Sequence, residues 1–249
     1  MNHQRILTIQ MVIAISIAFS GFVCVSNHAS AHPDCNLQRD LRGADLAGCD
    51  LGGANLSNGI GTDPTEANVP ERTGPDMTGA NLSNANLSRA NLSRAKLNGA
   101  NLTGARLGAN LYSADLSEAN LSDGRFHNKN MFLANLSGAN LTGAGLTYAK
   151  LFRADLHGAI LRDAILDTAM LMGANLRGAD LSNANLGWAN LEGADLTGAD
   201  LSDANLGGAK LDGADLTDAN LAHARIRTGV SRGDLKGAKG LGTVKGLVD

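Results

Sequence analysis

The sequence predicts an all-β solenoid, and three observations on one long stretch support that class. Residues 109–228 read as an unbroken series of five-residue units, in outline Ala-Asn/Asp-Leu-Ser/Thr-Gly. Apolar residues at every fifth position precess around a helix without forming a stripe, so the period excludes an amphipathic helix. On a strand, Ala and Leu two positions apart point to one side, and the Asn or Asp between them points to the other. The Ser/Thr-Gly pair then supplies a corner, so the chain must coil with Ala and Leu inside.

The two inward positions of the unit are nearly invariant along this stretch. The third position is Leu except at Phe126, Met131 and Ile226, and the first is Ala except at Gly124 and Lys129. Burying each Leu contributes roughly 2 kcal/mol. The resulting column of Leu and Ala leaves no interior space for a substrate.

The units also carry a resemblance to a known family. Residues 174–178 (Ala-Asn-Leu-Arg-Gly) and 194–198 (Ala-Asp-Leu-Thr-Gly) resemble the repeats of the pentapeptide repeat family. The resemblance covers roughly residues 35–228. It implies a right-handed quadrilateral β-helix, a β-solenoid of about nine coils with four pentapeptide units in each. At about 4.8 Å per coil, such a rod is on the order of 43 Å long.

The N-terminal segment has the pattern of an export signal. Arg5 lies in a short polar start, an apolar run follows from Met11 to Val25, and small residues at 29–31 offer a cleavage site. We expect residues 1–31 to be a signal peptide and the mature protein to be periplasmic or extracellular. A retained anchor helix is the alternative, although the apolar run is short for a membrane span. Removing Arg5 changes the formal charge from −3 to −4.

The mature chain, residues 32–228 with a C-terminal extension, keeps two cysteines. Cys35 and Cys49 form an even pair in an oxidising compartment, which favours a disulfide. Both occupy the inward position, however, and their units lie on neighbouring sides of the coil. A disulfide requires the two Cα atoms to lie within about 7 Å. The alternative is therefore that the two cysteines are small buried thiols without a disulfide between them.

Two segments interrupt or end the repeat. Residues 59–74 lose the period and contain Pro64 and Pro70, so they predict a surface loop from one corner. Residues 229–249 also lose the pattern and predict a cap over the last open coil, since a bare edge invites aggregation.

We expect no catalytic residues, no metal site and no cofactor. The histidines of the mature chain fall on different sides or corners of the coil, and Cys and His lack zinc-ligand spacing. No Gly-rich phosphate loop is present, and no nucleophile has a base beside it. The sequence therefore indicates a protein that is not an enzyme.

The period of twenty residues per coil sorts the outward residues onto four sides. One side gathers large apolar residues that other sides lack, and they are candidate partner-binding residues. They are Tyr112, Phe132, Phe152 and Met172 in one column, with Tyr148 and Trp188 at the adjoining corner. Two other sides carry columns of Asp and Asn. We expect Leu176 to be intolerant of charge and Asn175, which points outward, to be tolerant.

The aromatic column has two interpretations. Rings one coil apart can stack on each other and stabilise the rod, or an exposed apolar column can bind a partner. As a binding surface it would hold a second copy of the rod, an envelope protein or a glycan. The family resemblance adds a third class, DNA mimics that inhibit a topoisomerase. That class requires a strongly negative surface and a cytoplasmic target, whereas this chain is mildly acidic and expected to be exported, so we expect no nucleic-acid partner.

Overall fold

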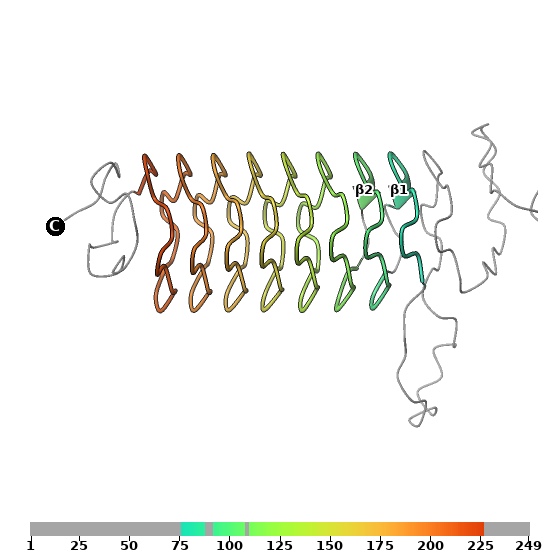
Figure 1. The fold of residues 1–249 in the computed structure, drawn as a ribbon, viewed down its shortest axis with the longest axis horizontal. Helices are drawn as coiled ribbons and strands as arrows, with labels where there is room; N and C mark the ends of the chain where they lie inside the picture. The colour runs from blue at the N-terminus through green and yellow to red at the C-terminus, as the bar shows by residue number, and fades with distance from the viewer. Residues whose placement is uncertain (1–75, 88–91, 108–109, 227–249) are drawn as a thin grey trace, which may run out of the picture.

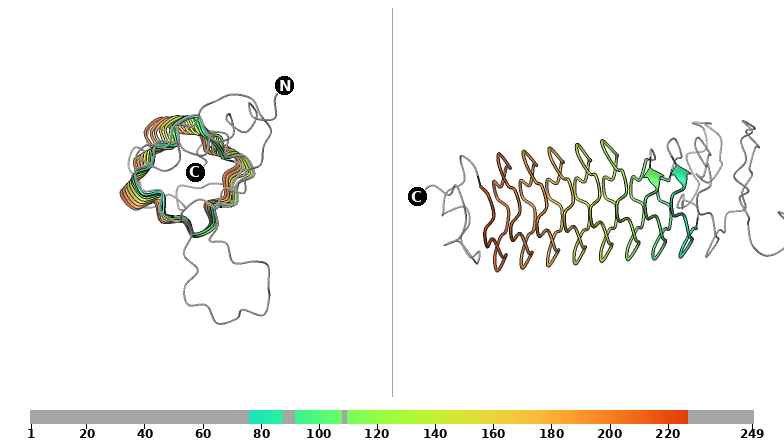
Figure 2. Two further views of the ribbon diagram at one scale, coloured as in Figure 1. Left: turned by 90° about the vertical axis from the view of Figure 1, so that its right-hand side faces the viewer. Right: turned by 90° about the horizontal axis from the view of Figure 1, so that it is seen from above.

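The computed structural model describes residues 76–87, 92–107 and 110–226, which wind into a rod of stacked coils (Figure 1). Parallel bridges join the second residue of each unit to its counterpart one coil further on, as in Asn175 with Asp195. Partners are twenty residues apart through most of the rod, so each coil contains four units. Viewed from the end, the coils superpose around one axis (Figure 2).

Regular strands are shorter than the alternation predicts. Only β1 (Asn86–Leu87) and β2 (Arg106–Leu107) are strands within the described ranges, and they pair in parallel. The other described sides pair through isolated parallel bridges. The chain turns directly after each central residue, so a side of the coil holds one bridged residue where three were expected. The described residues contain no α-helix.

One unit shows how every backbone N–H finds an acceptor. The Asn175 N–H bonds to the Ala154 oxygen at 3.0 Å, and the Leu176 N–H to the Asp195 oxygen at 2.7 Å. The Gly178 and Ala179 N–H groups bond to the oxygens of Thr197 in the next coil and Leu176 in the same turn, respectively.

Only the fourth N–H of the unit, that of Arg177, finds no backbone acceptor. It donates to Oδ1 of Asn175 at 3.3 Å. The same contact recurs from Ser117 to Asp115 and from Thr197 to Asp195. Asn or Asp at the second position therefore completes the hydrogen bonding of the turn, a role that its outward direction alone did not indicate.

The core has the predicted composition. Every described central residue is buried, and so is almost every Ala of the first position, while the described residues include no buried polar or charged side chain. Phe126 is the largest fully buried side chain, and Gly124 in the same unit makes room for it. A Cβ at Gly124 would lie 2.5 Å from the Phe126 ring. The two exceptions to the repeat therefore compensate for each other.

The corners require a left-handed backbone. The fifth residue of every described unit has a positive φ, between 52° and 73°. Glycine adopts this conformation freely, and Asn and Asp tolerate it, whereas bulky side chains are strained there.

Several predicted features lie outside the described residues. These are the signal peptide at 1–31, the Cys35–Cys49 pair, the loop at 59–74 and the cap at 229–249, so all four stay predictions. Among the residues that are described, none form a helix with the length and apolarity of a membrane span.

Candidate interaction face

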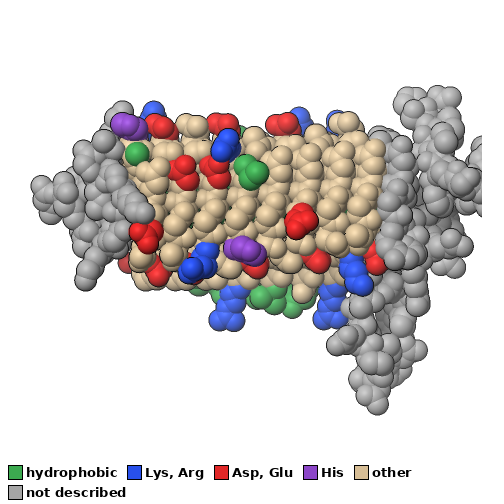
Figure 3. Space-filling view, viewed as in Figure 1, with side chains coloured by type: hydrophobic (Ala, Val, Ile, Leu, Met, Phe, Trp, Pro, Cys, Tyr) green, Lys and Arg blue, Asp and Glu red, His purple; other side chains and the backbone are tan. Residues whose placement is uncertain are grey.

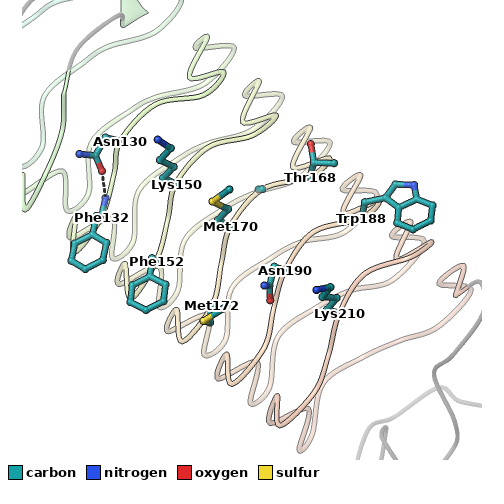
Figure 4. A pocket seen from close by; sticks show the side chains of 11 residues that line it. Asn130, Phe132, Lys150, Phe152, Thr168, Met170, Met172, Trp188, Asn190 and Lys210 are labelled. Atoms are coloured by element: carbon teal, nitrogen blue, oxygen red, sulfur yellow. Dashed lines mark hydrogen bonds between the residues drawn. The ribbon is translucent and has the colours of Figure 1, made fainter.

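The coil register brings the predicted aromatic column together. The ring centroids of Tyr112 and Phe132 are 5.7 Å apart, and those of Phe132 and Phe152 are 5.2 Å apart. The ring planes are nearly parallel, at 7° and 8°. Met172 continues the line one coil further on (Figure 4). We call these four residues the ladder.

The ladder is less exposed than the sequence suggests. All four side chains are half-buried, because each aromatic ring covers the face of its neighbour. The Arg153 guanidinium lies 5.4 Å from the centroid of the Phe152 ring, which is cation–π distance. The four side chains of the column are therefore only partly accessible. Self-stacking is real, and mainly ring edges remain for a partner.

A shallow groove of about 470 Å³ runs beside the ladder. Its lining is mostly apolar, with a Lys or Asn at intervals (Figure 4). The residues that matter below are Phe132, Phe152, Met172, Lys150, Met170, Trp188 and Lys210. We call the ladder, this groove and the adjoining corners the aromatic face. One edge of the rod gathers hydrophobic and basic side chains in this way (Figure 3).

The most exposed apolar side chains are on this face. Trp188 is 70% exposed, Tyr148 56% and Met170 49%. The indole of Trp188 lies against Gly208, where a Cβ would approach to 2.6 Å. Tyr148 occupies a corner at one side of the groove, but its side chain does not line the groove. The sequence placed Tyr148 and Trp188 at the same corner, whereas in the structure only Trp188 of the two lines the groove.

The corners of the aromatic face are unusual for the rod. Among the described left-handed corners, most hold Gly, Asn, Asp, Ser or a charged residue. The β-branched or large apolar residues in this conformation all border the aromatic face. They are Leu133, Tyr148, Thr168 and Trp188, with φ of 57°, 58°, 55° and 57°. Each costs about 1–2 kcal/mol relative to glycine.

The Asp columns on the other sides are held by hydrogen bonds and ion pairs. The Asn175 amide donates to Asp155 at 2.9 Å, and Arg177 pairs with Asp195 at 3.3 Å. Arg162 pairs with Asp180. Burial alone would raise the pKa of Asp180, but hydrogen bonds from Ser182 and Arg162 outweigh it and lower that pKa. The acidic sides are therefore partly neutralised.

Sequence reasoning grouped Met170 and Lys150 with this face but did not predict the groove that they line. Ile160 and Ile165 are exposed on other sides, so large apolar residues are not confined to the aromatic face.

The chemistry of the described residues gives no catalytic arrangement. No group of three or more His, Cys, Asp or Glu side chains in that part of the chain could hold a metal ion. His157 contacts the carboxylate of Asp155 at 3.3 Å on an exposed surface. The aromatic face offers contacts rather than reactive groups.

Comparison with known families identifies the repeat. The family model described as pentapeptide repeats matches residues 40–58, 76–108, 109–147, 149–187 and 199–227, which is more than half of the chain. The chain belongs to the pentapeptide repeat family. Pentapeptide repeat proteins adopt a right-handed β-helix and are generally non-catalytic structural or interaction proteins.

Solved pentapeptide repeat structures are similar to this chain. HetL from Nostoc sp. strain PCC 7120, involved in heterocyst differentiation regulation, is 33% identical over 77% of this chain and 90% of its own, with a TM-score of 0.40. Rfr23 from Cyanothece 51142 is 29% identical over 74% and 92%, with a TM-score of 0.23. QnrB1, a plasmid-mediated fluoroquinolone resistance protein, is 17% identical over 80% and 92%, with a TM-score of 0.38. No curated protein matches the chain.

Proposed function

We propose that this pentapeptide repeat protein is an exported, non-catalytic rod that holds a partner through its aromatic face. Counting the units outside the described residues, the rod would be a quadrilateral helix of about nine coils. The observation that carries the proposal is the set of strained corners. All the β-branched or large apolar left-handed residues among those described border this one face.

The argument from strain is energetic. Gly or Asn at these corners would be more stable, and the other sides of the rod mostly use such residues. Strained residues persist where their side chains contribute something other than folding stability. At Tyr148 and Trp188 the side chains are also the most exposed apolar groups of the described rod. A contact surface accounts for both properties.

Paired Asn substitutions separate binding from folding. Tyr148→Asn and Trp188→Asn keep a residue that tolerates positive φ and remove the contact surface. We expect loss of partner retention, measured by cross-linking and mass spectrometry on envelope material, with a melting temperature that is unchanged or higher. Glu118→Asn and His223→Asn are the matched controls, because both residues occupy left-handed corners away from this face. Full retention of partners by the first pair would contradict the proposal.

A glycan is the second candidate partner, and Trp188 is the observation that favours it. One face of its indole lies over Gly208, which leaves the other for stacking on a sugar ring, and Asn190 lies nearby in the groove. The ladder rings are unsuited to this, since their faces already cover each other. Polysaccharide pull-down with Trp188→Asn as control tests the glycan separately from a protein.

The DNA-mimic class has less support. Pentapeptide repeat proteins include topoisomerase-binding DNA mimics, but here Asn interrupts the Asp columns and Arg177 and Arg162 pair with them. Export distinguishes the classes. We expect the mature protein to begin at His32, and mass spectrometry that found an intact Met1 on a cytoplasmic chain would restore the topoisomerase alternative.

A further inference from the structure

The aromatic face is polarised along the rod. Its N-terminal half carries the ladder rings and the exposed cations Lys150 and Arg153. Two coils further on, the ladder position holds Glu192 and then Asp212. Lys210 and Trp188 also lie in this second half, and Lys210 pairs with Glu192 at 3.6 Å. The first half is therefore basic and the second carries a net negative charge, with Met170 and Met172 between them.

The corner beside the ladder changes in size in the same direction. It holds Leu133 and Arg153 in the N-terminal half, and Gly173, Gly193 and Gly213 beyond them. A Cβ at Gly193 or Gly213 would meet nothing within 4 Å, so this end of the corner is open. Large and small residues are arranged about the same midpoint as the charges.

We propose that the aromatic face binds a second copy of this chain in antiparallel orientation, about a two-fold axis at the coil of Met170 and Met172. This inference rests on the proposed function of the face. A surface whose two halves are complementary to each other fits an isologous contact, in which the same patch is used on both copies. Charge and size both meet that condition here.

The axis fixes which residues meet. Reversing the coil order about Met172 brings Phe152 opposite Glu192 of the second copy, and Arg153 opposite the open corner at Gly193. On the other edge of the face, Tyr148 meets Trp188. Met170 meets Met170, and flexible Met side chains pack well at such a centre. The contact covers five coils, about 24 Å along the rod, which is at the small end of specific interfaces, so we expect micromolar affinity.

Cysteine cross-linking tests the axis. In a chain with Cys24, Cys35 and Cys49 replaced by Ala, Met170→Cys should oxidise to a covalent dimer. Ile165→Cys is the matched control, because Ile165 holds the same position in the preceding unit and is 45% exposed, against 49% for Met170. The control should stay largely monomeric at the same concentration. Equal cross-linking at the two positions would overturn the inference.

Charge reversal tests the pairing. Arg153→Glu places two carboxylates together in a homodimer, and Glu192→Lys places two cations together. Each variant alone should self-associate at least about tenfold more weakly than the wild type by sedimentation. A mixture of the two restores opposite charges at both contacts and should recover most of the affinity. Failure of the mixture to recover, with both variants folded, would contradict the antiparallel pairing.

The two proposals fail separately. A wild-type protein that stays monomeric at high micromolar concentration, with no preferential cross-linking at Met170, excludes the second copy as the occupant. The proposed interaction function is then tested separately, by whether Tyr148→Asn and Trp188→Asn lose another partner from envelope material.

Discussion

The aromatic face and the side that carries Asp155, Asn175 and Asp195 share one backbone geometry, yet different forces hold their outward columns. On the aromatic face, rings 5.2 to 5.7 Å apart cover one another. On the other side, Asn175 donates to Asp155 in the coil before and accepts from the Arg177 N–H in its own turn. The ring column adds stacking and a cation–π contact with Arg153, whereas the Asn and Asp column also completes the backbone hydrogen bonding.

The comparison shows where the rod departs from its most stable sequence. In two coils of the aromatic face the second position holds Lys150 and Met170, which lack the amide oxygen by which Asn130 accepts from the Phe132 N–H. The same face contains the strained corners at Tyr148 and Trp188. The aromatic face, where we place the contact surface, is therefore less stable than the repeat permits. The side that carries Asp155, Asn175 and Asp195 is closer to the most stable sequence.

The largest expected effect lies in the core that both sides share. Leu176→Asp would bury an unpaired carboxylate, since Leu176 is fully buried. We expect a loss of at least about 4 kcal/mol in the free energy of unfolding, with neighbouring coils unfolding, because each coil is supported by the next. Circular dichroism during denaturant titration measures it. A stable variant with a wild-type spectrum would contradict the inside–outside assignment.

Breaking the ladder should have the next largest effect. Phe132→Ser removes two ring contacts and Tyr112→Ser only one, because Phe132 stacks on both Tyr112 and Phe152. At about 0.5–1.5 kcal/mol for each aromatic contact, beyond the lost apolar burial, Phe132→Ser should cost roughly 1 kcal/mol more. Equal losses at the two positions in urea titrations would show that ring stacking contributes little.

The corresponding break on the polar side should be smaller. Asn175→Asp keeps the oxygen that accepts from the Arg177 N–H but loses the donor to Asp155, and it adds a carboxylate between Asp155 and Asp195. We expect a loss of about 0.5–1.5 kcal/mol. Part of the loss should disappear at 1 M salt, where the Debye length is about 3 Å. If Asn175→Asp leaves the stability unchanged, the Asn175 side chain points outward without stabilising the turn.

The polar side should also respond to acid. Hydrogen bonds from Ser182 and Arg162 outweigh burial and lower the pKa of Asp180 in the folded protein. Its contribution to stability is therefore complete above the unfolded pKa of about 3.9 and is lost as the pH falls through the folded value. Asp180→Asn should flatten the fall in melting temperature below about pH 4. Ser182→Ala and Arg162→Ala should each flatten it in part, and an unchanged profile would contradict this assignment.

The smallest effect is expected at the corner of the aromatic face. Trp188→Asn relieves a strained left-handed residue and loses the packing of the indole on Gly208, two changes of opposite sign. The free energy of unfolding should change by no more than about 0.5 kcal/mol, with a correspondingly small shift in the melting temperature. A loss above about 2 kcal/mol would mean that the indole is structural.

The five-residue period by itself determined the class of fold, the inward direction of Ala and Leu, the corners, and the register that aligns Tyr112 with Phe132 and Phe152. These features follow from local geometry repeated without interruption. The exceptions Phe126 and Gly124 were also visible in one unit, but only the structure shows that the missing Cβ of Gly124 makes room for the Phe126 ring.

Other features depended on distances between coils, which only the tertiary structure supplies. Whether the ladder rings are exposed or stacked depends on their tilt, and the groove depends on how far Trp188 leans over Gly208. The role of Asn175 emerges only when every backbone N–H of its unit is counted and one is left over. A repeat specifies which residues are neighbours, whereas their contacts are decided by rotamers and by the separation of the stacked coils.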